Sequence, residues 1–435
     1  MSKSTKKTST ISKPFRLIKT VGDISEYQLK SNGLRVLYKY IPETGVVTTN
    51  ITYLVGASNE QNGESGVAHM LEHMLFKPTV TDLKNKSAGA AMKFERDVGV
   101  ILNANTWKDR TTYYFSYGQE HFTRALQIEA DRMRNVVLTN KEFLPERTNV
   151  LSEFDMYNGD PKFALSVGLT STAFFSHPYG HETIGFREDI ESYTTEKLQC
   201  FYNHYYRPNN AVLMVIGDIE LKTVLKEIAD NFSHLEPEPS VETRPIIVEP
   251  KQEGTRRFAI QRPGTTNILA IAVKHPGFPT SGWYETMIVL KLLTGGPTSW
   301  LQKKLVDTGL ASSIEVSQEP TKDTNIATIF ITLTKKITHQ TMEALALKII
   351  RDFDQKLIAK ELPGYIAKSL TEEAFSRDSS LHIAAELTEF TAAGRWEDYF
   401  NVSERLTAIN VSAIKQRLES LFTEDQLTIG TYKSL

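Results

Sequence analysis

Two histidines and a glutamate stand close together in one apolar stretch of the sequence, at His69, Glu72 and His73. The surrounding residues, from Gly66 to Phe76, have an apolar spacing that predicts a helix. On a helix, residues four apart lie one turn apart on the same face, so both imidazoles would point the same way. Two imidazoles in this arrangement can bind one zinc ion. The pattern therefore predicts a zinc site on this helix.

The glutamate beside the second histidine has a different predicted role. Glu72 follows His69 by three residues and projects toward the same face of the helix. A carboxylate in that position can take a proton from a water molecule that zinc activates and later pass it to the leaving amine. The order H-x-x-E-H is the reverse of the commoner H-E-x-x-H. Glu72 is thus the predicted general base of a zinc peptidase with one Zn²⁺ per chain.

A catalytic zinc site needs a third protein ligand and one open position. A second helical segment supplies it, because Glu146, Val150 and Glu153 fall on one face at i, i+4 and i+7. We predict that Glu153 is the third metal ligand and that Glu146, two turns earlier, orients a histidine. The alternative for His69 and His73 is an ordinary surface or core position on an amphipathic helix, without metal.

The elements that position these residues mix strands with helices. Strands are predicted between residues 27 and 55 and at 111–117, and helices at 64–75 and 121–137. Because the strands are antiparallel in character and do not alternate strictly with helices, the fold class is α+β.

A Pro- and Glu-rich segment divides the chain into two parts of similar size. Residues 234–254 lack periodicity and are predicted to link a domain at 24–233 to a second at 255–435. The helix–strand unit that begins at residue 190 aligns without a gap on the one that begins at residue 406, which indicates a duplication. The alternative is that any two amphipathic helix–strand units align equally well.

Composition and charge disfavour several classes of protein. The formal net charge of −2 over 435 residues indicates neither a nucleic acid nor an anionic membrane as partner. The apolar runs are strand-sized, and a single cysteine, Cys200, allows no internal disulfide, so we expect a cytoplasmic protein. Residues 1–23 are basic and rich in Ser and Thr, which predicts a disordered tail; an organelle transit peptide is the alternative.

With these residues identified, the sequence resembles the pitrilysin family of zinc peptidases, which includes insulin-degrading enzyme and the mitochondrial processing peptidases. The similarity covers nearly the whole chain from about residue 25 and is weaker in the C-terminal half. It is most specific at Gly56–Lys77, Leu102–Thr106, Glu146–Glu153 and further landmarks as far as Asp218. It supports Glu153 as a ligand and Glu146 as an auxiliary acid. It also implies two homologous α/β sandwich-like domains, mostly antiparallel sheet flanked by helices, that form half of a clamshell. Unfolded oligopeptides would be cut inside the chamber of a dimer.

The resemblance further implies how a peptide binds. It is expected to add as a strand to an exposed sheet edge. In this sequence that edge corresponds to Leu102, Asn103, Ala104, Asn105 and Thr106. Main-chain hydrogen bonds would then give affinity with little demand on the peptide's sequence.

The second half of the chain departs from the family pattern. Some members carry an Arg and a Tyr, seven residues apart, that reach the substrate carbonyl, whereas this chain has Leu305 and Ser312 there. Neither side chain can stabilise an oxyanion as Arg and Tyr would. The expected assembly is a heterodimer whose sister chain supplies both residues, and a homodimer is the alternative. A non-catalytic scaffold and a peptide-binding chamber without turnover are the competing functions.

Overall fold

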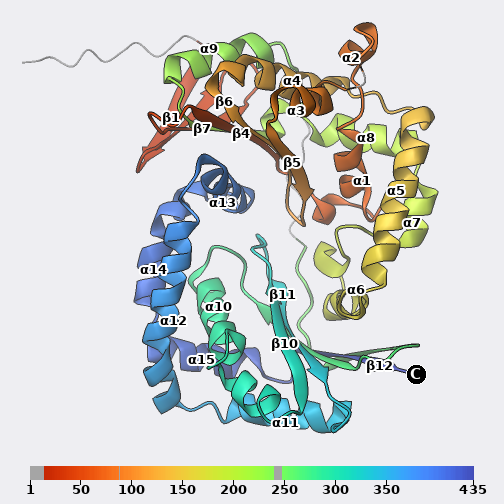
Figure 1. The fold of residues 1–435 in the computed structure, drawn as a ribbon, viewed down its shortest axis with the longest axis vertical. Helices are drawn as coiled ribbons and strands as arrows, with labels where there is room; N and C mark the ends of the chain where they lie inside the picture. Colours follow the sequence, from red (N-terminus) through yellow and green to blue (C-terminus); the bar gives the residue numbers. More distant parts are fainter. Residues whose placement is uncertain (1–13, 88, 240–246) are drawn as a thin grey trace, which may run out of the picture.

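The computed structural model describes residues 14–87, 89–239 and 247–435, which form two β-sheets flanked by helices (Figure 1). The first sheet contains β1 (Phe15–Val21), β2 (Ile24–Leu29), β3 (Arg35–Tyr40), β4 (Val46–Tyr53), β5 (Ile101–Thr106), β6 (Thr111–Gly118) and β7 (Ala211–Gly217). The second contains β8 (Arg256–Arg262), β9 (Ile268–His275), β10 (Ala311–Gln318), β11 (Asn325–Leu333) and β12 (Leu427–Ser434). The predicted α+β fold is confirmed.

The helices fall into two groups along the chain. The N-terminal group comprises α1 (Val67–Met74), α2 (Val80–Lys84), α3 (Ala90–Val98), α4 (Phe122–Asn135), α5 (Asn140–Asn158), α6 (Pro161–Ala173), α7 (Arg187–Ser192), α8 (Thr195–Tyr205) and α9 (Leu221–Phe232). The C-terminal group comprises α10 (Ser281–Thr294), α11 (His339–Arg351), α12 (Gln355–Phe375), α13 (Ser380–Ala392), α14 (Val402–Ala408) and α15 (Val411–Leu421). Within the described ranges, none of the helices combines the length and apolar character needed to cross a membrane.

The two sheets share one strand arrangement. In the first, β7 lies between parallel β3 and antiparallel β4, followed by β6 and β5. In the second, β12 lies between parallel β8 and antiparallel β9, followed by β11 and β10. The helix–strand units that align in sequence are α8–β7 and α15–β12, and their helices have N-caps at the aligned residues Thr194 and Asn410. This shared order supports the predicted duplication, because two unrelated helix–strand units would not be expected to occupy the same place in both sheets.

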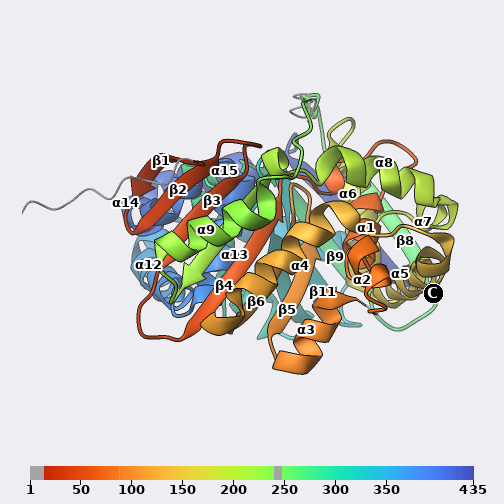
Figure 2. The same ribbon diagram turned by 90° about the horizontal axis from the view of Figure 1, so that it is seen from above.

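Each sheet is covered on one face by a helix from the other half of the chain. Helix α13 packs on β4 and β7, and α6 packs on β12 and β8 (Figure 1). On the outer face of the first sheet lie α4 and α9 (Figure 2). Strand β7 is apolar and buried throughout, with alternate residues in the core beneath α9 and in the core shared with the C-terminal half. The two halves therefore form one packed body.

The predicted N-terminal segment needs correction. Strand β1 lies at Phe15–Val21 and pairs with β2, so the disordered tail predicted for residues 1–23 is wrong over residues 15–23. The strand was missed because its stability depends on pairing across the turn at Gly22, where φ is 57°. Residues 1–13 of the predicted tail lie outside the described residues. In the predicted linker the same holds for 240–246, and the described residues 236–239 and 247–254 form neither helix nor strand.

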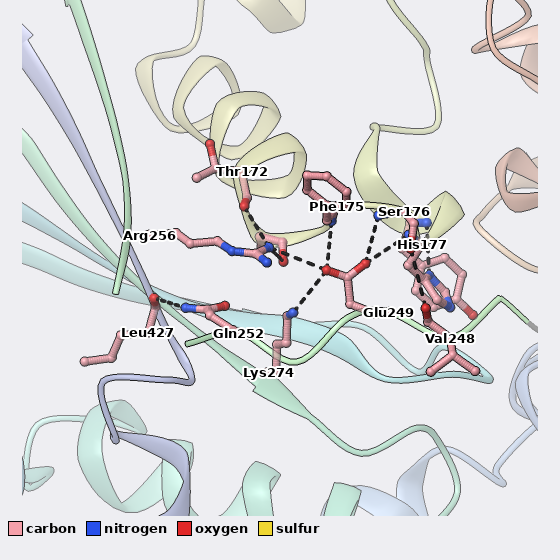
Figure 3. Close-up of polar contacts among 12 residues, drawn as sticks. Thr172, Phe175, Ser176, His177, Val248, Glu249, Gln252, Arg256, Lys274 and Leu427 are labelled. Atoms are coloured by element: carbon pink, nitrogen blue, oxygen red, sulfur yellow. Dashed lines mark hydrogen bonds and ion pairs between the residues drawn. The ribbon is translucent and has the colours of Figure 1, made fainter. Parts of the chain in front are cut away.

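One linker residue joins the two halves through its carboxylate. Glu249 accepts hydrogen bonds from the backbone N–H groups of Phe175, Ser176 and His177, at 2.8–3.1 Å (Figure 3). Its Oε1 also lies 3.5 Å from both Arg256 Nη1 and Lys274 Nζ. Burial opposes ionisation, but the three N–H donors and the Lys274 charge lower the pKa of Glu249 to about 2.

Replacing this carboxylate by an amide is expected to destabilise the protein in a pH-dependent way. Glu249→Gln should lower the free energy of unfolding at pH 7 by about 1–3 kcal/mol, because hydrogen bonds to a charged group are lost. A carboxyl group whose folded pKa is depressed stabilises the fold above its ordinary pKa of 4.5 and loses that effect as pH falls toward 2. Urea unfolding of both proteins between pH 7 and 3 measures the difference.

The exposed linker residue Glu253 provides the control. Glu253→Gln should leave stability unchanged at every pH. A Glu249→Gln effect that stayed constant from pH 7 to 3 would show that the carboxylate charge is not the source of the stabilisation.

Candidate metal centre

The helix that carries the two histidines, α1, is fixed at its N-terminus. The N–H groups of Gly66 and Ala68 donate to the Glu60 carboxylate at 2.7 and 2.9 Å, and His181 Nε2 lies 2.8 Å from the same group. Gly66 has a φ of 89°, and a Cβ there would lie 2.3 Å from the carbonyl oxygen of Ile184. Only glycine fits this close approach. The helix begins at Val67, three residues later than predicted.

Helices α1 and α5 bring the predicted ligands together. His69 Nε2 lies 3.9 Å from Glu153 Oε1, and His73 Nε2 lies 3.4 Å from Glu153 Oε2. One ligand atom from each of the three residues lies within 4.8 Å of the other two. Atoms so spaced can share one ion at the distances of about 2.0–2.2 Å that zinc makes to imidazole and carboxylate. The donor set of two imidazoles and one carboxylate therefore fits zinc.

Glu146 contacts His73 through the ring nitrogen that does not face Glu153. Its Oε1 lies 2.9 Å from His73 Nδ1, and its Oε2 pairs with Lys77. The His73 hydrogen bond is the main reason why the pKa of Glu146 is lowered to about 2. Burial lowers the pKa of His73, but hydrogen bonds to Glu146 and Glu153 outweigh it and raise this pKa to about 9. The surroundings of His73 thus favour positive charge, as a site for a metal cation requires.

Removal of the Glu146 charge is expected to weaken zinc binding. Glu146→Gln should lower zinc affinity about 10–100-fold, because residues that orient a ligating histidine have effects of this size. Competition with a chromophoric chelator measures the affinity. Glu142→Gln, one turn earlier on the same helix and facing the same cavity, is the matched control and should bind zinc as the wild type does. Equal affinity in both variants would contradict a supporting role for Glu146.

The predicted general base is buried and oriented. Glu72 is 9% exposed, and Thr106 Oγ1 donates to Glu72 Oε2 at 2.6 Å. Burial is the main reason why the pKa of Glu72 is raised above its usual value of 4.5. A raised pKa makes a carboxylate a better proton acceptor near neutral pH.

A cavity of about 1020 Å³ joins the metal residues to strand β5. His69, Glu72, His73, Glu146 and Glu153 line it. So do all five residues predicted to bind peptide, Leu102, Asn103, Ala104, Asn105 and Thr106. Strand β5 is the edge of its sheet and, in the described part of the chain, pairs only with β6. Its other edge can accept an added strand.

The structure also places the two residues that depart from the family pattern. Leu305 lies in a π-helical turn, Gln302–Val306, and is fully buried in the C-terminal core. Ser312 is exposed on β10 and donates to the carbonyl oxygen of Thr332 at 3.4 Å. Neither is among the described residues that line the cavity.

Sequence reasoning missed several supporting side chains. These are Glu60 near the start of α1, Lys77 beside Glu146, and Tyr157, which helps to lower the pKa of Glu153. Spacing could have found Tyr157, which follows Glu153 by four residues on the same helix. Thr106 was predicted to bind peptide, and its bond to Glu72 was not foreseen.

Comparison with known proteins gives consistent matches along the chain. Residues 35–186 match the sequence model described as insulinase (peptidase family M16), and residues 192–368 match that of the peptidase M16 inactive domain. The zinc protease PqqE of Helicobacter pylori is 35% identical over 282 residues, which are 63% of this chain and 62% of that protein, less than two thirds of its length. The uncharacterised zinc protease YmxG of Bacillus subtilis is 24% identical over 405 residues, 91% of this chain and 95% of that protein.

A solved structure extends the likeness to the fold. The crystal structure of a protease from Helicobacter pylori superposes with a TM-score of 0.89 at 28% identity, over 95% of this chain and 100% of that one. The resemblance to pitrilysin-like peptidases seen in the sequence is thereby confirmed. Because the two family models together extend from residue 35 to 368 and the fold agrees, the chain belongs to the insulinase (M16) family of peptidases.

Proposed function

We propose that this chain is a zinc metallo-endopeptidase, or the catalytic subunit of one, that hydrolyses unfolded oligopeptides inside a dimer chamber. A single observation carries the proposal. The ligand atoms of His69, His73 and Glu153 converge beside Glu72, in the same cavity as the free edge of β5. Ligands, base and peptide edge are the three parts that a zinc peptidase requires.

The chain's own residues divide the chemistry between them. His69, His73 and Glu153 would hold zinc, which when bound polarises the scissile carbonyl as a Lewis acid. Glu72 accepts a proton from the attacking water and passes it to the leaving amine. Thr106 holds one oxygen of that carboxylate, so Glu72 does not have to be oriented at the moment of reaction.

A peptide bound along β5 would pass directly over this site. Because Thr106 ends β5 and bonds Glu72, a peptide paired with the strand lies next to the general base. Pairing through main-chain atoms needs few specific side chains, so we infer that the substrate must be extended and unfolded rather than of one sequence.

The proposed dimer follows from the absence of the Arg and Tyr at positions 305 and 312 of this chain. With Leu305 buried and Ser312 on the surface, oxyanion donors would come from a sister chain in a heterodimer; a homodimer is the alternative. Residues up to 233 and residues 255–435 would be the two homologous domains of one half-chamber, linked by 234–254. The single cysteine remains the reason for proposing a cytoplasmic location.

A second candidate function is a scaffold or peptide-binding subunit without turnover. The observation that favours it is the same pair, Leu305 and Ser312, at positions where active relatives would supply Arg and Tyr. The intact set of three ligand residues and Glu72 favours the peptidase instead, because a scaffold has no need to retain it.

The proposal is tested by cleavage of a quenched fluorescent peptide. The zinc-loaded chain is assayed first alone and then mixed with family members that carry the Arg and Tyr but lack the zinc motif. We expect weak cleavage alone and a strong increase in the mixture. Full activity of the chain alone would refute the need for a sister chain. Absence of cleavage in every mixture, with zinc bound, would favour the scaffold.

A further inference from the structure

The turn between β5 and β6 connects the peptide strand to both halves of the molecule. The N–H groups of Ala57 and Ser58, in the segment before α1, donate to the carbonyl oxygens of Trp107 and Lys108 at 3.0 and 2.8 Å. From the C-terminal half, the N–H of Lys322 donates to Asp109 Oδ2 at 2.8 Å. The turn is thus in contact with the segment that precedes the metal helix and with the loop between β10 and β11.

The side chain of Arg110 makes the most direct of these connections. Its Nε donates to Glu389 Oε1 on α13 at 3.1 Å, and its Nη2 donates to the same oxygen. Its Nη1 donates to Asn105 Oδ1 on β5. Arg110 is 5% exposed, so its charge has to be paired inside the protein. A planar guanidinium presents its N–H donors in a rigid fork, whereas the three donors of an ammonium group rotate on a flexible stem.

These contacts hold the end of β5 from both faces of the sheet. Successive residues of a strand point to opposite faces, so Asn105 and Thr106 project in opposite directions. Thr106 bonds Glu72 on the side of α1, and Asn105 bonds Arg110 and, through it, Glu389 on the side of α13. Two contacts therefore fix β5 relative to the general base. One is the bond from Thr106 to Glu72 in the N-terminal half, and the other is the bridge through Arg110 to Glu389 in the C-terminal half.

We propose that Arg110 is a positioning residue, through which Glu389 of the C-terminal half sets the conformation of β5 for peptide binding. The inference rests on the proposed function for its consequence in peptide binding. Positioning by Arg110 would give the C-terminal half a role in the site of this chain, although Leu305 and Ser312 replace the Arg and Tyr of other family members. The simpler alternative is that Arg110 and Glu389 only stabilise the packing of α13.

A variant of Thr388, the neighbour of Glu389 on α13, distinguishes positioning of β5 from simple packing of α13. Thr388 is buried and accepts a hydrogen bond from Asn50 Nδ2 at 3.1 Å, which also joins α13 to the first sheet but does not involve β5. Thr388→Val removes that bond while keeping the shape of the side chain. Thr388→Val should lower the stability of the protein without changing the protection of β5, whereas Glu389→Gln should lower both the stability and the protection of β5.

The experiment uses the full-length, metal-free chain and two measurements. Hydrogen exchange followed by mass spectrometry reports the protection of residues 101–106 without any peptide. Fluorescence anisotropy reports binding of a fluorescein-labelled, unstructured decapeptide of mixed sequence. We expect Glu389→Gln and Arg110→Lys each to speed exchange in residues 101–106 and to weaken peptide binding about tenfold. The double variant should bind no more weakly than either single one, because both act through one bridge.

Each outcome decides a separate point. Unchanged exchange at residues 101–106 in Glu389→Gln overturns the proposal, as does equal loss of protection and binding in Thr388→Val. If the wild type binds peptide and the Glu389→Gln protein binds it equally well, positioning by Arg110 is wrong while the proposed function stands. If the wild type binds no peptide, the proposed binding of peptide along β5 by this chain alone is wrong, and the exchange data still decide whether Arg110 ties β5 to the C-terminal half.

Discussion

Glu72→Gln is expected to lower the rate of peptide cleavage by about 10²–10⁴-fold, the contribution typical of a positioned general base. The amide has the shape of the carboxylate, so the hydrogen bond from Thr106 can remain. It cannot accept the proton of the attacking water. Because Glu72 lies beside the three ligand residues rather than among them, the variant should bind one equivalent of zinc, as the wild type does.

This prediction needs metal analysis and kinetics on the same preparation. Zinc is measured by mass spectrometry after gel filtration, and cleavage by a quenched fluorescent peptide. Glu95→Gln is a matched control, since Glu95 lines the same cavity on α3 and should leave the rate within a fewfold of wild type. Equal cleavage by Glu72→Gln and the wild type would indicate a contaminating protease or a wrongly assigned site.

His73→Ala is expected to lose the metal and, with it, all activity. The change removes one of three ligands and leaves Glu146 and Glu153 without the imidazole that both contact. Two remaining ligands do not hold zinc at the affinity of a three-ligand site. The same zinc measurement should give less than about a tenth of an equivalent after dialysis.

The control for this variant is a histidine outside the cavity. His204→Ala, on α8, should retain both zinc and activity. Full zinc occupancy in His73→Ala would show that the ion is bound elsewhere. Glu72→Gln should therefore lose activity while it keeps the metal, whereas His73→Ala should lose both.

The grouping of His69 and His73 could be predicted because it depends only on helical geometry. A helix places residues four apart on one face whatever surrounds it, so His69 and His73 had to point the same way. The same rule put Glu146 and Glu153 on one face of a second helix, and the spacing reduced the choice of third ligand to few carboxylates. The fold class was likewise evident from the local periods of 2 and 3.6 residues.

Other features were inaccessible to such rules. The strand at Phe15–Val21 was missed because pairing with β2, rather than its own composition, stabilises it. The bond between Arg110 and Glu389 joins residues 279 positions apart, and Glu249 bridges backbone and side chains from both halves. No local pattern marks these residues, since an isolated Arg or Glu in a polar stretch is usually solvated.

The sequence by itself determined that His69, Glu72 and His73 share one helix face, and it predicted from that arrangement which residues bind zinc and abstract a proton. Only the tertiary structure decided that Glu153 faces His69 and His73, that Thr106 orients Glu72, and that a helix from the second half covers the first sheet. The reason is physical. Backbone geometry directs side chains along one element, whereas contacts between distant elements depend on how their apolar faces pack against each other.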